Sequence, residues 1–174
     1  IKMSFLDLVK KRGSVRAYLD KAVSKEKIEQ ILTTAHLAPS AKNLQPWHFI
    51  VLQKPENKSK IYECYGRDWL KQAPVILVVC ANHQISWKRS MDNKDHSDVD
   101  VAIVIDHLTL AAAEQGLGSC WICMFDAQKC AQLFDLPEYM EPIALIPLGY
   151  PAKAMDERHL QRKELAEMVS WEQY

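Results

Sequence analysis

A short basic segment near the N-terminus groups positive charge around a hydroxyl. Arg12 and Arg16 flank Ser14 in this segment. Arginine binds phosphate oxygens through paired N–H donors, and a hydroxyl adds a further hydrogen bond. Gly13 suits a close approach between backbone and ligand, although a glycine also commonly ends a helix. The segment is a candidate phosphate site, and the alternative is a solvated basic helix end, because two lysines precede it.

A second polar segment, residues 39–46, presents a hydroxyl and two amides within a few positions. Ser40, Asn43 and Gln45 can donate and accept hydrogen bonds, so they match a planar ring that carries carbonyl oxygens and ring nitrogens. Loops between regular elements often carry function on a rigid support. The alternative is an ordinary polar turn that follows a helix. Taken together, the two segments suggest a ligand with a phosphate at one end and an amide-like ring at the other.

The CxxC sequence formed by Cys120 and Cys123 invites a redox or zinc interpretation. A zinc site built from paired motifs needs a second CxxC, and the sequence contains none. The glycines that precede the motif favour a strand here, and residues three apart on a strand point to opposite faces. We therefore expect that the two thiols do not act as a redox pair.

Other patterns that carry chemistry are incomplete in this sequence. The six histidines show no HExxH spacing. The aspartates between 92 and 100 lack the glycine and the closing glutamate of a calcium-binding loop, so a solvated loop and helix start is expected there. No GxGxxG, GxxxxGK[ST] or GxSxG sequence occurs. We therefore expect neither a metal site nor a dinucleotide fingerprint.

Length and composition limit the classes of function. The 174 residues favour one domain, residues 1–174, with a core of its own. The formal net charge of zero argues against nucleic acid or an anionic membrane as a partner. The longest apolar run, residues 75–81, is far shorter than the about 20 residues of a membrane span. Five cysteines without an export signal favour reduced thiols and a cytoplasmic location.

Helices and strands alternate irregularly along the chain. Apolar residues recur at three- and four-residue spacing in several segments, which predicts helices. These are expected after Ser4, from Ser24 to Pro39, over 100–115 and over 127–134. Strands are expected at 47–52, 75–80, 119–125 and 143–148. The order predicts an α+β fold with helices packed on one central sheet.

The polar C-terminal tail still carries large apolar side chains. They are Leu165, Met168, Val169, Trp171 and Tyr174. Such groups need a surface to cover, and a partner subunit is one candidate.

The motifs resemble those of the nitroreductase family of FMN-dependent oxidoreductases. Residues 12–16 resemble the family's Arg-x-Ser-x-Arg phosphate motif, and residues 39–47 resemble its Pro-Ser-x-x-Asn-x-Gln-Pro-Trp loop. Residues 116–122, followed by Phe125-Asp126, resemble the strand that passes the flavin ring. Residues 148–151 and Arg162-Lys163 complete a resemblance that spans nearly the whole chain.

The resemblance implies a fold, a cofactor and an assembly. The fold would be α+β, with a central mixed, mainly antiparallel sheet flanked by helices and a C-terminal tail that extends onto a dimer partner. The assembly would be a homodimer with one FMN in each of two interface pockets. NAD(P)H would donate electrons, and a small aromatic acceptor such as a nitroarene or a quinone would accept them in a ping-pong cycle.

The resemblance also assigns roles to residues. Arg12, Ser14, Arg16 and Arg162 would hold the phosphate. Ser40 and Asn43 would approach the flavin, from the same subunit or from its partner. Ile122 and Cys123 would offer backbone groups near the reactive edge of the ring. No side chain is expected to act as a catalytic acid or base. Gly13, Pro39, Gln45 and Lys163 belong to the same motifs and complete the expected cofactor-binding set.

The sequence departs from the family pattern at two of these positions. Many relatives have arginine where this chain has Gly13, and many have glycine where this chain has Cys123. The first change removes a cation, and the second narrows the pocket by a side chain. Three alternatives stay open. One is an enzyme of the same fold with another outcome, such as enone reduction, dehalogenation or flavin breakdown. The second is a flavin-binding or sensor protein without catalysis, and the third is a globular partner-binding domain without a cofactor.

Overall fold

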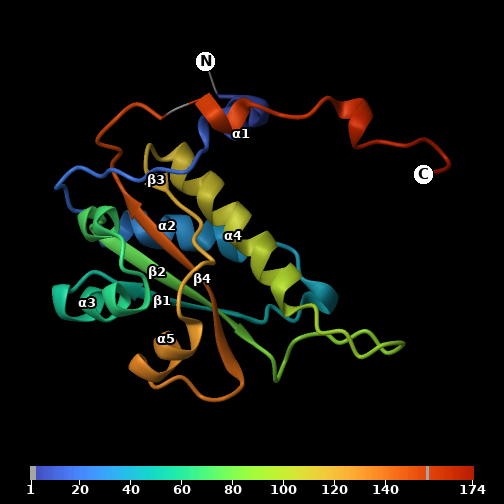
Figure 1. Cartoon of the computed structure of the whole chain (residues 1–174), viewed down its shortest axis with the longest axis horizontal. Coiled ribbons are helices and arrows are strands. Elements are labelled where there is room, and N and C mark those ends of the chain that lie inside the picture. Colours follow the sequence, from blue (N-terminus) through green and yellow to red (C-terminus); the bar gives the residue numbers. More distant parts are fainter. Residues whose placement is uncertain (1–2, 156) are drawn as a thin grey trace.

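The computed structural model describes residues 3–155 and 157–174. Within these residues the chain forms five α-helices around one four-stranded sheet (Figure 1). The helices are α1 (Phe5–Lys11), α2 (Lys25–His36), α3 (Pro55–Cys64), α4 (Ser97–Glu114) and α5 (Ala127–Leu133). The strands are β1 (Trp47–Leu52), β2 (Val75–Asn82), β3 (Gly118–Ser119) and β4 (Met140–Gly149). The predicted α+β fold, a sheet flanked by helices, is confirmed.

The sheet has the strand order β1-β2-β4-β3, and each neighbouring pair is antiparallel. Its central strand, β2, is apolar on both faces because each face is covered. Val75, Leu77 and Val79 point into one core cluster, with residues of α2 and α4. Ile76 and Val78 point into the other, with residues of α3 and α5. The two-residue period of a strand thus divides the core into two layers.

Side-chain caps fix where helices α1 and α2 begin. The Ser4 hydroxyl accepts from the Asp7 amide, and the Asp7 carboxylate accepts from Ser4 in return, which closes a capping box at the start of α1. The Ser24 hydroxyl accepts from Lys27 and caps α2. Both starts agree with the sequence prediction.

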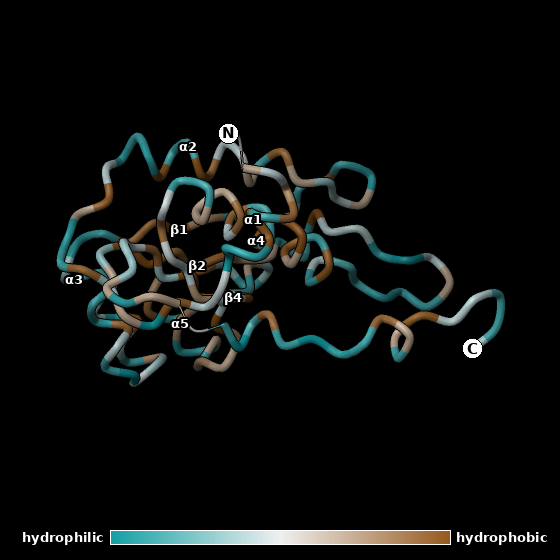
Figure 2. Tube along the Cα trace, turned by 90° about the horizontal axis from the view of Figure 1, so that it is seen from above, coloured by the Kyte–Doolittle hydropathy of each residue, from teal (hydrophilic) through white to brown (hydrophobic). Residues whose placement is uncertain are grey.

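Two ends of the described chain leave apolar side chains uncovered. Phe5 in α1 is 72% exposed and Trp171 in the tail is 86% exposed. Among the described residues after β4, the regular elements are two short 3-10 turns, Glu157–Leu160 and Leu165–Glu167. Figure 2 shows this tail running away from the body of the molecule, with apolar residues along it. That the tail covers a dimer partner stays a prediction.

Two local predictions differ from the structure. The strand expected over 119–125 is regular only at Gly118–Ser119, followed by an isolated bridge between Ile122 and Leu145. Polar and turn-forming contacts break the ladder there, since the Phe125 amide donates to the Cys123 carbonyl. Helix α3 was not predicted, although Pro55 occupies its first turn, where proline is favoured.

No helix in the described part of the chain is long and apolar enough to cross a membrane.

Candidate functional site

The basic segment is extended and runs alongside β3 and then alongside the residues that follow β4. The Val15 amide donates to the Ser119 carbonyl at 2.8 Å, and the Leu19 amide donates to the Tyr150 carbonyl at 2.9 Å. Ser14 also forms a parallel bridge with Ser119. Alternation along the segment then buries Val15 and leaves Ser14 and Arg16 exposed. The backbone is fixed, and the hydroxyl and guanidinium face outward.

Two buried residues support this segment from below. The Tyr18 hydroxyl donates to the Val15 carbonyl at 2.8 Å, and burial raises the pKa of this phenol far above its usual range. Gly118 lies directly under Val15, because a Cβ at Gly118 would lie 2.6 Å from the Val15 Cγ2 atom. A glycine is therefore required for the strand and the segment to approach this closely. Neither Tyr18 nor this role of Gly118 was inferred from the sequence.

Ser14 and Arg16 line a polar cavity of about 330 Å³ together with Met155, Arg158 and His159. An adjoining cavity of about 260 Å³ adds Lys153 to Ser14, Arg16 and Arg158. Three basic side chains and a hydroxyl therefore surround one region of space. This set of donors suits a phosphate group.

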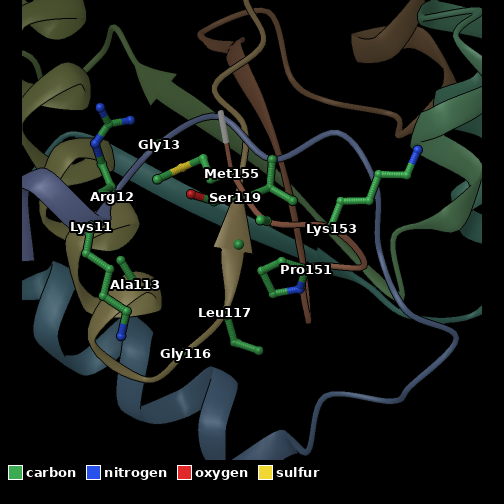
Figure 3. Close-up of a pocket in the computed structure, with 13 residues that line it drawn as sticks. Lys11, Arg12, Gly13, Ala113, Gly116, Leu117, Ser119, Pro151, Lys153 and Met155 are labelled. Carbon is green, nitrogen blue, oxygen red and sulfur yellow. The ribbon is translucent and has the colours of Figure 1, made fainter. Parts of the chain in front are cut away.

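Arg12 and Gly13 line a neighbouring cavity of about 290 Å³ instead. Figure 3 shows Met155 lying across Gly13, with Arg12 and Lys153 on opposite sides. A Cβ at Gly13 would overlap the Met155 sulfur, so the absence of a side chain at this position makes room for Met155. This contact gives a physical reason for glycine at position 13.

The late basic residues are placed differently from the sequence expectation. Arg162 and Lys163 are exposed and do not line the cavities around Ser14 and Arg16. Lys153 and Arg158 occupy that place. Both residues lie in the polar stretch after Pro151. Nothing in their spacing distinguishes them from the other basic residues of the tail, so the sequence alone could not select them.

The polar loop before β1 contains three residues with unusual backbone angles. Lys42, Asn43 and Gln45 have φ values of 50°, 55° and 50°. The Ser40 hydroxyl accepts from the Gln45 amide at 2.9 Å, and the Gln45 side chain donates to the Asn43 carbonyl at 3.1 Å. The loop therefore has a defined shape with Asn43 exposed and Pro39 exposed at its start.

The two polar segments lie at opposite ends of α4. The loop contacts the start of the helix, where the Ala41 amide donates to Asp100 Oδ1 at 2.9 Å. The basic segment lies by its end, where Ala113 lines the same cavity as Arg12. Asp100 and Ala113 are thirteen positions apart on the helix, a rise of about 20 Å. Figure 1 shows α1 beside the C-terminal end of α4.

The CxxC residues have different environments. Cys120 is buried and Cys123 is exposed, and all five cysteines are free thiols. Burial raises the pKa of the Cys120 thiol, although the Arg16 guanidinium and the Ser14 hydroxyl act in the opposite direction. The Ile122 amide and carbonyl both pair with Leu145, at 3.1 and 2.9 Å. Among the described residues no hydrogen bond uses the Cys123 amide, so this backbone donor is available to a ligand.

The described residues contain no group of three or more histidine, cysteine or acidic side chains placed to hold a metal ion.

Comparison with known proteins decides the family. The model of the nitroreductase family matches residues 9–65 and 60–150. This chain belongs to the nitroreductase family. The predicted resemblance is therefore confirmed, and the matched residues include both polar segments.

Individual relatives agree with the family assignment. A Methanothermobacter thermautotrophicus protein named NADH dehydrogenase/NAD(P)H nitroreductase is 34% identical over 98% of this chain and 89% of its own length. A Bacillus subtilis protein named FMN reductase [NAD(P)H] is 33% identical over 80% of this chain and 62% of its own length.

Solved structures show the same fold. A nitroreductase family protein from Clostridium difficile 630 superposes with a TM-score of 0.92 at 38% identity, covering 99% of this chain and all of that one. An FMN-dependent nitroreductase from Clostridium difficile R20291 has a TM-score of 0.80 at 27% identity, covering 98% of this chain and all of that one.

Proposed function

We propose that this chain is an FMN-dependent oxidoreductase that passes reducing equivalents from NAD(P)H to small aromatic acceptors such as nitroarenes and quinones. Residues 1–174 would act as one FMN-binding domain. Its relatives are named as NAD(P)H oxidoreductases, and one solved neighbour is named FMN-dependent. The observation in this chain that carries the proposal is the polar cavity around Ser14 and Arg16.

The side chains around that cavity fit the phosphate of FMN. Arg16 and Arg158 can each present paired N–H donors, and Ser14 adds a hydroxyl. Lys153 contributes a further positive charge to the adjoining space. The Ser14 backbone is bridged to Ser119, so the backbone of this segment does not have to be ordered when a phosphate enters. Arg12, Arg162 and Lys163 would then act from the margin of the site or from a partner subunit.

The separation of the two polar segments supports a site shared by two subunits. In one chain the cavity lined by Arg12 and Gly13, next to the phosphate cavity, lies at the end of α4, and the Ser40–Gln45 loop lies at its start. A two-fold axis across α4 would place the start of the partner's helix beside the end of this one. Ser40, Asn43 and Gln45 would then reach the ring of an FMN whose phosphate the other subunit holds. We therefore propose a homodimer with two interface sites.

Residues after β3 would contact the ring. The Cys123 amide is available to donate, and a preorganised donor near a ring stabilises negative charge that develops there. When bound, FMN would supply the hydride and electron transfer itself. The protein would position the ring and shape the space above it, and no acidic or basic side chain would be needed.

Apolar groups near the same segment favour a flat substrate. Trp121 is exposed and Phe125 is half-buried on either side of Cys123. Aromatic side chains of this kind suit planar rings by stacking. The donor and the acceptor would occupy this space in turn, which predicts ping-pong kinetics with parallel double-reciprocal lines. Intersecting lines would argue for two separate sites.

The visible absorbance spectrum of the purified protein tests the cofactor assignment. Bound flavin colours the protein yellow, either as purified or after incubation with FMN. Anaerobic addition of NADH or NADPH should then bleach the flavin absorbance. A protein without flavin absorbance in both preparations would refute the proposal. Bound flavin that neither nucleotide reduces would favour a flavin-binding or sensor protein without catalysis.

A further inference from the structure

Asp100, in the first turn of α4, is a carboxylate buried in the protein interior. Its exposed fraction is 2%, and the other buried polar residues of the described chain, Ser97, Thr109 and Ser119, carry no carboxylate. Burying a carboxylate is unfavourable unless hydrogen bonds compensate for the lost water. Oδ1 accepts from the Ala41 amide at 2.9 Å, whereas Oδ2 has no hydrogen-bond partner in the described structure. Within the described structure, the hydrogen bond from the Ala41 amide is thus the one that compensates the side chain of Asp100 for its burial.

The loop that receives this bond does not hold its shape through ordinary backbone preferences. Lys42, Asn43 and Gln45 all adopt left-handed φ values, which side chains other than glycine disfavour. Such a conformation persists only where its surroundings impose it. Hydrogen bonds within the loop, such as that from the Gln45 amide to the Ser40 hydroxyl, contribute to this shape, and a contact with another segment holds each end of the loop. At its start the contact is with Asp100, and at its end the Asn82 amide donates to the Pro46 carbonyl at 2.8 Å.

We propose that Asp100 is a positioning residue for the cofactor loop. By holding the Ala41 amide, it sets the direction in which Ser40 and Asn43 face a bound FMN, although it does not touch the cofactor itself. The part that concerns FMN rests on the proposed function. The part that concerns the loop does not, because the hydrogen bond can be measured in the protein without cofactor.

The variant Asp100→Leu separates positioning from stability. Leucine has a similar shape and suits a buried position, so removing a poorly partnered carboxylate should leave the thermal unfolding midpoint unchanged or raise it. The Ala41 amide loses its acceptor, so its hydrogen exchange, followed by NMR in cofactor-free protein, should accelerate at least about tenfold. FMN affinity should fall by roughly ten- to a hundredfold. The visible circular dichroism of bound flavin should change as well.

Asp98→Leu is the matched control, because Asp98 lies in the same helical turn but is exposed. It makes the same change of charge near the start of α4 and should leave both the Ala41 exchange rate and the FMN affinity at their wild-type values. Asp100→Asn retains an oxygen that can accept from Ala41 and should restore most of the FMN affinity. If Asp100 served only to stabilise the fold, Asp100→Leu would lower the unfolding midpoint. Unchanged stability in Asp100→Leu, together with restored FMN affinity in Asp100→Asn, would exclude that role.

Wild-type exchange and wild-type FMN affinity in a folded Asp100→Leu protein would overturn the inference. If that variant did not fold, Ala41→Pro would remove the same bond from its donor side. Ala41 begins a 3-10 turn (Ala41–Asn43) after the extended residue Ser40, and both features suit proline. Unchanged FMN affinity in Ala41→Pro would overturn the inference equally. A wild-type protein that binds no FMN would instead refute the proposed function, and the exchange measurement would still decide the role of Asp100.

Discussion

Arg16 presents its guanidinium to a cavity while hydrogen bonds of neighbouring residues fix its backbone. If this cavity holds the FMN phosphate, Arg16→Ala removes a charge-assisted hydrogen bond, which is typically worth about 1.5–3 kcal/mol. FMN affinity should then fall by roughly ten- to a hundredfold, as measured by titration of the cofactor-free protein. Arg67→Ala, at an exposed arginine elsewhere, is the control and should bind FMN normally. An unchanged affinity in Arg16→Ala would place the phosphate elsewhere.

Cys120 and Cys123 form a motif that suggests redox chemistry, but the structure places them in unlike surroundings. Cys120 is buried beside Ser14 and Arg16, and burial keeps its pKa raised, so the reactive thiolate form is disfavoured. Cys120→Ser should therefore retain most NAD(P)H oxidation by the FMN-loaded protein. The measurement is the steady-state rate at saturating donor. Loss of activity with FMN still bound would mean that the thiol takes part in the reaction.

At the scale of elements, His83 ties the segment between β2 and α4 to the sheet. Its Nδ1 lies 3.0 Å from Asp95 Oδ2, and its Nε2 lies 2.6 Å from Glu141 Oε2. Partial burial opposes the charge on His83, but the hydrogen bonds to Asp95 and Glu141 outweigh it and raise the pKa of the imidazole. Partial burial likewise opposes the charge on Asp95, yet hydrogen bonds from His83, Ser97 and Ser86 hold its pKa below the usual range.

These shifts predict how stability depends on pH. Because the pKa of His83 is raised by folding, its contribution is complete below about pH 6.5 and is lost as the pH rises through the folded-state pKa. Because the pKa of Asp95 is lowered, its contribution is present above about pH 4 and is lost on acidification. The thermal unfolding midpoint should therefore fall between pH 6 and pH 9 by more in the wild type than in His83→Gln. His36→Gln, at an exposed histidine, should behave as the wild type; parallel curves for wild type and His83→Gln would contradict the prediction.

Elements with a strong local signal were predictable from the sequence, and contacts between distant segments were not. Strand β1 matches its predicted bounds because the polar loop gives way there to a run of aromatic and branched apolar residues. Helix α3 was missed because only Ile61 and Cys64 of its ten residues are buried, so its apolar pattern is weak. Ser14 and Arg16 were selected from their spacing, and their contact with a phosphate stays a prediction. Arg158 and Asp100 were not, because their roles depend on where the tail and α4 lie relative to segments far away in sequence.

At the scale of the whole molecule, apolar surface is exposed on elements that a two-fold interface would use together. Phe5 and Leu6 of α1 and Val99 of α4 are exposed. Leu165, Met168 and Trp171 of the tail are exposed as well. A contact that covers them in an obligate dimer would bury more than roughly 2,000 Å² in total. We therefore expect light scattering of the FMN-loaded protein to report a dimer. A stable monomer that retains FMN would argue decisively against a shared site.

Mixing two defective variants tests whether each site takes its halves from different subunits. Arg16→Ala damages the phosphate half, and Asn43→Ala damages the ring half, so each variant alone should bind FMN weakly. In a mixed dimer one site collects both defects, and the other combines the intact phosphate half of one subunit with the intact loop of its partner. After subunit exchange at random, half of the dimers are mixed, so roughly one quarter of all sites should regain wild-type affinity. Each variant taken through the same exchange alone is the control. If mixed dimers formed but no tight sites were restored, both halves of a site would have to come from one subunit. The two halves lie about 20 Å apart along α4, so FMN binding would then require a large rearrangement of the subunit.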